Sequence, residues 1–194
     1  LYDKYNRVQS DALSGRVIVL CHGLCMSHLS WQVADEGNLV ETLSSKLPNT
    51  TVLYLNYNTG RRISTNGRSF AKVLQDLVEN NPDITQLDLI GHSMGGLLSR
   101  SALFYGKEQG FSWVERVGNL ITLGSPHHGA SLEQIGHFVQ DKIAKLPFAG
   151  SLAKLGDLRS AGIIELRYGS IRDADWRSAE GRSVLPAEFL HPTR

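Results

Sequence analysis

The sequence predicts an α/β fold in which helices cover both faces of a parallel sheet. Short apolar runs rich in β-branched residues alternate with longer stretches whose apolar residues recur at helical spacing. The runs stop at turn residues such as Gly, Asn or Ser, as strands do. Because strands alternate with helices, crossover connections must join them, which makes the strands parallel and places helices on both sides.

Four strands and three helices are expected in this alternating part. The first strand, residues 16–21 (RVIVLC), is followed by His22-Gly23 and has the composition of a strand buried on both faces. The remaining strands are expected at residues 51–57, 86–90 and 116–123. The helices are expected at residues 39–47, at residues 70–78 before the stop at Asn80-Asn81-Pro82, and from Met94 to Gly106 or Gly110.

The pattern changes after Pro126. Apolar residues at positions 132, 135, 139, 143 and 146 predict an amphipathic helix, and residues 152–166 predict further helix with no strand between. We therefore expect residues 1–130 to form the core, and residues 131–194 to form a helical cap or lid with a polar tail. An ordinary packing helix is the alternative interpretation of this second region.

Composition excludes several classes of partner. The chain has 194 residues, 41% of them hydrophobic, which suffices for one sizeable core. Twenty basic residues face nineteen acidic ones, so no net field favours nucleic acid or an anionic membrane. The apolar runs are far shorter than the roughly 20 residues that span a bilayer. Cys21 and Cys25 are too few for a disulfide framework and are expected to be reduced.

Gly91-His92-Ser93-Met94-Gly95 fits the pattern Gly-x-Ser-x-Gly, directly after a predicted strand and directly before a predicted helix. The order matters, because a sharp and strained turn has to project the serine hydroxyl from the carboxyl edge of the sheet. Side chains at positions 91 and 95 would collide with neighbouring backbone. The motif therefore predicts Ser93 as a nucleophile, with an idle serine in a tight packing turn as the alternative.

Two backbone amides are candidates for binding negative charge in front of Ser93. The helix that begins at Met94 places N–H groups and a positive dipole end there. A second donor is expected from the loop after an earlier strand, where His22-Gly23-Leu24 follows residues 16–21, so Leu24 is the candidate. His22 is expected to shape this loop by hydrogen bonding rather than to transfer protons.

The stretches VIVLCHGL, LDLIGHSMGGLLSR and LITLGSPHHGAS resemble the bacterial lipases and the GPI inositol-deacylase-like esterases of the α/β-hydrolase superfamily. The resemblance covers residues 16–130. It implies the α/β-hydrolase fold, a Ser-His-acid triad, hydrolysis of a small-molecule or lipid ester, and no cofactor or metal. By match to the motif, Ser93 is the nucleophile, and Leu24 and Met94 are the oxyanion-hole residues.

The acid and the histidine of such a triad are not evident. In this fold each lies after the serine, on a loop that follows a further strand, and no β-branched run ending in Asp follows residue 123. We therefore expect the sequence to be incomplete at its C-terminus and to lack both partners. The alternative pairs Asp173 or Asp175 with His191. The adjacent His127 and His128 precede any such acid and are poor ligands for one metal ion.

Three functions remain under consideration. The first is a carboxylic ester hydrolase that works through an acyl-enzyme, and the second is acyl transfer to an alcohol by the same nucleophile. The third is a non-catalytic protein of this fold that binds a lipid or a partner. An amphipathic helix after Ser131 favours an apolar acyl chain and is compatible with transient contact with a lipid surface. Oligomeric state is open, and so is the compartment, with a cytoplasmic location favoured over secretion.

Overall fold

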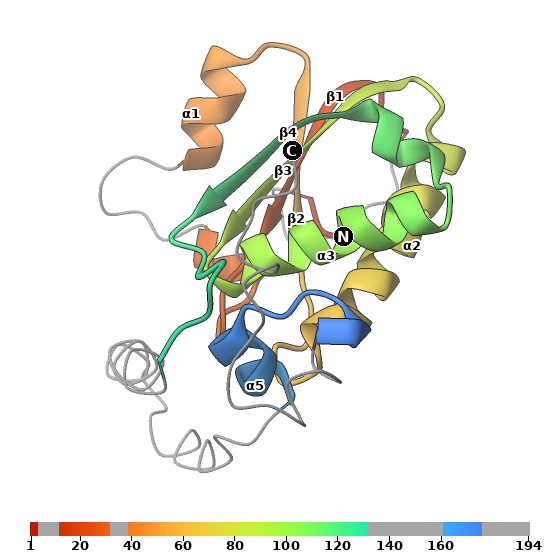
Figure 1. Cartoon of the computed structure of the whole chain (residues 1–194). Helices are drawn as coiled ribbons and strands as arrows, with labels where there is room; N and C mark the ends of the chain where they lie inside the picture. The colour runs from red at the N-terminus through yellow and green to blue at the C-terminus, as the bar shows by residue number, and fades with distance from the viewer. Residues whose placement is uncertain (4–11, 32–38, 132–160, 176–194) are drawn as a thin grey trace.

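The described residues form a sheet of four strands, all parallel. The computed structural model describes residues 1–3, 12–31, 39–131 and 161–175 (Figure 1). The strands are β1 (Gly15–Cys21), β2 (Thr50–Leu55), β3 (Ile84–His92) and β4 (Val117–Leu123). Their order in the sheet is β2-β1-β3-β4, and each neighbouring pair is parallel. The carboxyl ends of all four strands therefore lie along one edge of the sheet.

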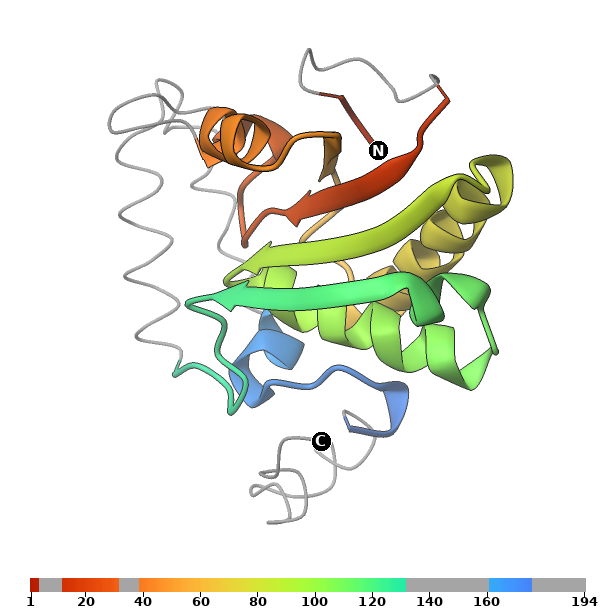
Figure 2. The same cartoon turned by 90° about the horizontal axis from the view of Figure 1, so that it is seen from above.

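Helices cover both faces of this sheet, which confirms the predicted fold class. Figure 2 shows α1 (Leu39–Lys46) on one face, and α2 (Ile63–Asn80) and α3 (Met94–Glu108) on the other. A further helix, α5 (Ala161–Tyr168), lies on the same side as α2 and α3 (Figure 2). Two 3₁₀ helices, η1 (His28–Trp31) and η2 (Ser112–Arg116), lie in the connections after β1 and α3.

The apolar core has a larger part and two smaller parts. The larger part fills the space between the sheet and the helices α2 and α3, and it includes fully buried Leu53, Leu74 and Trp113. A smaller part packs α1 against the other face of the sheet. The third part joins α5 to the amino ends of α2 and α3. Burial of these side chains supplies most of the free energy that stabilises the domain.

The structure corrects the predicted start of α2. The helix begins at Ile63, seven residues before the predicted start at residue 70. Polar Ser64 and Asn66 interrupt the apolar pattern, yet both are buried, and each hydrogen-bonds to another part of the chain. The strands were placed within about two residues of their actual ends. The helix predicted at 132–146 lies outside the described residues, and the division at residue 130 stays a prediction.

A buried carboxylate joins three strands. Asp88 on β3 accepts hydrogen bonds from Arg16 Nε on β1 at 2.6 Å, from Asn119 Nδ2 on β4 at 2.8 Å, and from Gln86. Burial opposes ionisation of Asp88, but these donors outweigh it and lower the pKa of Asp88 below its ordinary value. The ionised Asp88 carboxylate therefore links β3 to both neighbouring strands.

Cys21 and Cys25 are both free, as predicted. Burial raises the pKa of the Cys21 thiol to about 12, which keeps it protonated at neutral pH. Among the described helices, none is long and apolar enough to span a bilayer.

Candidate active site

Ser93 occupies a strained turn between β3 and α3. Its backbone has φ 52° and ψ −120°, a conformation that residues with a Cβ rarely adopt. The turn is fixed on both sides, because Ser93 N donates to Leu123 O at 2.8 Å and Gly96 N donates to Ser93 O at 3.1 Å. The Ser93 side chain is partly exposed at the carboxyl edge of the sheet. The strain expected from the motif is therefore present.

The flanking glycines are required by close backbone contacts. A Cβ on Gly91 would lie 2.4 Å from Gly96 N, and a Cβ on Gly95 would lie 2.2 Å from Cys21 O. Real Cβ atoms do not approach backbone this closely, so any other residue would force the turn open. The second contact also shows how near the elbow lies to the end of β1.

The loop after β1 lies against the elbow. Cys21 and Gly91 are partners in the parallel register of β1 and β3, so the residues that follow them emerge side by side. A Cβ on Gly23 would lie 3.3 Å from the Ser93 Cβ and 3.0 Å from His92 Nδ1. His92 also makes an edge contact with Trp31, with the ring centroids 6.4 Å apart. The chain thus brings the two motifs together.

Leu24 and Met94 are both buried, and their side chains belong to one apolar cluster. Met94 is the first residue of α3, where backbone N–H groups lack an acceptor within the helix. Within the described residues no acceptor bonds the N–H of Leu24 or that of Met94. The two amides predicted as oxyanion donors are therefore not occupied by a described protein acceptor.

His22 is held inside its loop. Its Nδ1–H donates to Gly23 O at 2.9 Å, and its Nε2 accepts the N–H of Tyr57 at 3.4 Å. The Tyr57 ring stacks on the imidazole at 4.3 Å, and its hydroxyl donates to His22 O at 2.8 Å. Burial lowers the pKa of His22, so the ring is neutral at pH 7. Both ring nitrogens thus serve the shape of the loop.

His127 pins the turn after β4. The Arg100 guanidinium lies 3.0 Å from His127 Nδ1 and can only donate, so Nδ1 accepts. The other ring nitrogen then donates to Thr122 Oγ1 at 3.1 Å. Burial, followed by the nearby Arg100 and His128, lowers the pKa of His127. A neutral ring with both nitrogens engaged holds the turn against α3 and β4.

Two of the three alternative triad residues lie in the segment after α5. Asp175 accepts from the backbone N–H groups of Ile171 and Arg172, each at 3.0 Å, and pairs with the Arg172 guanidinium. Asp173 pairs with Arg68, and its N–H donates to Tyr105 Oη.

Tyr105 lies about 16 Å along α3 from Met94, at 1.5 Å per residue. Asp173 is therefore bound beside the far part of α3 rather than beside Ser93. His191 lies outside the described residues, so a pairing with either aspartate stays a prediction.

The residues that sequence reasoning missed lie on α5. Ile163 and Leu166 pack in the same apolar cluster as Leu24 and Met94. Glu165, between them in sequence, is fully buried. The sequence signal was a charged residue, Glu165, within the apolar run Gly-Ile-Ile-Glu-Leu. Its hydrogen-bond partner, Ser64, is about one hundred residues earlier and could not be inferred from the pattern.

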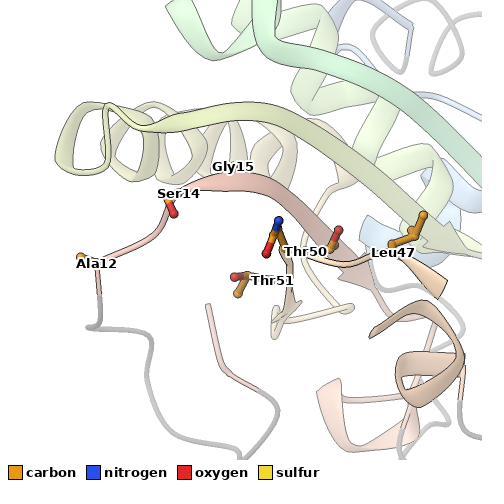
Figure 3. Close-up of a pocket in the computed structure, with 7 residues that line it drawn as sticks. Ala12, Ser14, Gly15, Leu47, Thr50 and Thr51 are labelled. Atoms are coloured by element: carbon orange, nitrogen blue, oxygen red, sulfur yellow. The ribbon is translucent and has the colours of Figure 1, made fainter. Parts of the chain in front are cut away.

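A separate hollow lies at the opposite edge of the sheet. It has a volume of about 330 Å³ and is lined mainly by polar residues near the amino ends of β1 and β2, among them Ser14, Asn49 and Thr51 (Figure 3). Ligands of parallel sheets bind at the carboxyl edge, so this hollow is not the candidate site. Nowhere in the described segments do three His, Cys, Asp or Glu side chains gather as metal ligands would.

Comparison with known proteins places this geometry in context. The profile of a family described as "PGAP1-like alpha/beta domain" matches residues 12–193. The mature form of the Bacillus licheniformis lipase BlEst2 is similar over 86% of the chain, with 25% identity and a TM-score of 0.54. The propeptide form of that lipase is similar over 87% of the chain, with 24% identity and a TM-score of 0.57. The chain covers 60% of the mature lipase and 34% of the propeptide form. A search of curated proteins finds no match.

Proposed function

The chain belongs to the PGAP1-like alpha/beta domain family, and from that premise we propose that it is a carboxylic ester hydrolase with Ser93 as its nucleophile. Its fold is that of esterases and lipases. One observation carries the proposal. The strained turn at Ser93 lies against the loop after β1, which supports the N–H groups of Leu24 and Met94 as donors to the substrate oxygen. This is the arrangement that acyl transfer requires.

In the proposed reaction, Ser93 Oγ forms a bond to the ester carbonyl carbon, and the π electron pair moves onto the carbonyl oxygen. The N–H groups of Leu24 and Met94 donate to that oxygen while it is negative. Collapse restores the carbonyl and breaks the bond to the alcohol, which leaves with the proton that Ser93 lost. Water then attacks the acyl-enzyme, releasing the acid and regenerating Ser93.

The base that carries this proton is a histidine outside the described residues. Neither His22 nor His127 suits the role, because His22 is fully buried and His127 has both ring nitrogens engaged. A general base needs a nitrogen within hydrogen-bond reach of the nucleophile. His191, paired with Asp173 or Asp175, is one such candidate within this chain.

An ester with an apolar acyl group is the proposed substrate class. Leu123, at the carboxyl end of β4, is 41% exposed, and Leu29 in η1, after β1, is 50% exposed. Leu123 ends β4 and Leu29 lies in the connection after β1, and both strands end at the edge where Ser93 lies. Exposed apolar side chains beside a nucleophile favour an acyl chain over a polar group.

A fluorophosphonate probe tests the proposal on the full-length protein. We expect a covalent adduct on Ser93, located by peptide mass mapping, and no adduct in the Ser93→Ala variant. A folded, full-length protein with no adduct would exclude the nucleophile and favour a non-catalytic lipid- or partner-binding protein. Product analysis with a competing alcohol separates hydrolysis from acyl transfer.

A further inference from the structure

The helix α5 lies directly behind the two proposed oxyanion donors. Its Ile163 and Leu166 are buried in a cluster with Leu24 and Met94. Ile63, the first residue of α2, completes the contact between them. Side chains packed this closely transmit displacement, because protein interiors leave little empty space. Any shift of α5 therefore moves the residues whose amides are the proposed oxyanion donors.

Glu165 anchors α5 to the amino end of α2. Its carboxylate accepts the Ser64 N–H at 3.1 Å and the Ser64 hydroxyl at 3.0 Å, and the Arg62 guanidinium lies 3.6 Å away. No local side chain caps α2. The carboxylate is fully buried and takes the place of that cap from a helix about one hundred residues later.

A second contact holds α5 against the turn that precedes α2. A Cβ on Gly162 would lie 2.2 Å from Thr59 O and 2.7 Å from Arg61 O, so only glycine allows α5 to lie this close. The side chain of Thr59 in turn accepts the N–H of Cys25 at 3.4 Å. Cys25 follows Leu24 directly, so the turn that α5 contacts also binds the loop that carries the proposed donor Leu24.

We propose that Glu165 is a positioning residue for the oxyanion site. By fixing α5 to the residues before and at the start of α2, it sets where the N–H groups of Leu24 and Met94 lie relative to Ser93. This inference rests on the proposed function of Ser93 and deepens it. Glu165 touches no substrate and acts only through the packing of α5.

The test compares three variants of the full-length protein: Glu165→Ala, Glu165→Gln and Ile164→Ala. Gln keeps an acceptor for Ser64, whereas Ala has none. Ile164 is 42% exposed on α5 and serves as the matched control. The measurements are kcat and KM for an ester, and the inhibition constant of a trifluoromethyl ketone, whose adduct with Ser93 carries an oxyanion.

We expect Glu165→Ala to lower kcat about tenfold, since loss of a whole donor costs about a hundredfold or more. KM should stay within about twofold, because only interactions made in the transition state are lost. The trifluoromethyl ketone should bind more weakly in proportion to the loss in kcat. Glu165→Gln should recover most of kcat, and Ile164→Ala should match the wild type.

Gly162→Ala provides a second way to displace α5 if Glu165→Ala does not fold. The added methyl group should lift α5 from Thr59 and lower kcat while Glu165 remains. A folded Glu165→Ala or Gly162→Ala protein with unchanged kcat and ketone binding would overturn the inference, as would a Gln variant no better than Ala. Lack of a Ser93 adduct in the wild type would instead reject the proposed function, so the two failures are distinguishable.

Discussion

The helices α2 and α3 begin in the same apolar cluster, yet their amino ends differ. Neither end has a side-chain cap from its own segment. At α2, the Glu165 carboxylate fills the space in front of the first N–H groups. At α3, which starts after the strained Ser93, no acidic side chain of the described residues bonds the Met94 N–H.

This difference separates a structural helix end from one that can take part in a reaction. A helix amino end carries about half a positive charge. At α2 a buried carboxylate bonds to the helix end and binds two parts of the fold together. At α3 no described acidic side chain bonds the Met94 N–H, and in the proposed reaction this end stabilises the oxygen that becomes negative. The experiments below alter one end at a time.

Replacement of Ser93 by alanine should have the largest effect, because it removes the proposed nucleophile at the start of α3. We expect esterase activity to fall by about 10⁴-fold or more. The fold should persist, since no described residue hydrogen-bonds to the Ser93 side-chain oxygen. Steady-state kinetics measure the loss, and circular dichroism checks the fold. Retention of more than a hundredth of the activity would contradict the assignment.

Removing the Glu165 carboxylate from the amino end of α2 should destabilise the protein without altering Ser93. Glu165→Ala leaves the Ser64 N–H and hydroxyl buried without their acceptor, which should cost about 2–4 kcal/mol of unfolding free energy. Urea denaturation measures this cost. Ile164→Ala, at an exposed position of the same helix, should cost no more than about 1 kcal/mol. Equal effects of the two variants would show that Glu165 is not an anchor.

Glycine at position 93 should reveal the backbone strain in the turn before α3. Glycine adopts positive φ freely, so Ser93→Gly should be about 1 kcal/mol more stable than Ser93→Ala, although both are inactive. Thermal denaturation of the two variants measures the difference. A less stable glycine variant would mean that the conformation is not costly for a residue with a side chain.

The smallest expected effect is a pH dependence of the stability that Glu165 contributes at the start of α2. Burial raises the pKa of Glu165 despite the bonds from Ser64 and the nearby Arg62. The Glu165 carboxyl group thus binds its proton more tightly in the folded protein than in the unfolded chain. Because of this, the stability that protonated Glu165 contributes is lost as pH rises from the ordinary Glu pKa of about 4.3 through the raised pKa. Glu165→Gln has no such titration, so its stability relative to wild type should improve as pH rises above the ordinary Glu value.

Asp88 supplies the matched control for this pH series. Its folded pKa is lowered, so its stabilisation is present at neutral pH and is lost as pH falls through the ordinary Asp value and then the lowered one. The unfolding free energy of Asp88→Asn, relative to wild type, should therefore increase as pH falls. That of Glu165→Gln should increase as pH rises. Urea denaturation at several pH values measures both slopes. Slopes of the same sign would contradict the assignment.

The two helix ends also differ in what the sequence reveals. The turn at Ser93 depends on neighbours within a few residues, because Gly91 and Gly95 are required by contacts that the motif itself creates or that β1 adds. Strand, turn and helix could therefore be predicted together. The sheet could be predicted for the same reason, since each strand is a short apolar run.

The start of α2 could not be predicted, because Ser64 and Glu165 meet only in the folded chain. Local patterns show which residues are apolar, but they do not show which buried polar residue finds which partner. Asp173 and Asp175 illustrate the same limit. Their residue type suggested a triad, whereas contacts with Arg68, Arg172 and Tyr105 are visible only in three dimensions.

The tie between Arg16, Asp88 and Asn119 bears on how the chain avoids folding errors. A slip of one residue between two strands turns every side chain to the opposite face. It would leave the Asp88 carboxylate buried without its donors, at a cost of several kcal/mol. Misaligned intermediates are thus penalised far from the reactive edge. A defect introduced at Arg16 should consequently appear first as slower or less faithful folding, before any change in chemistry at Ser93.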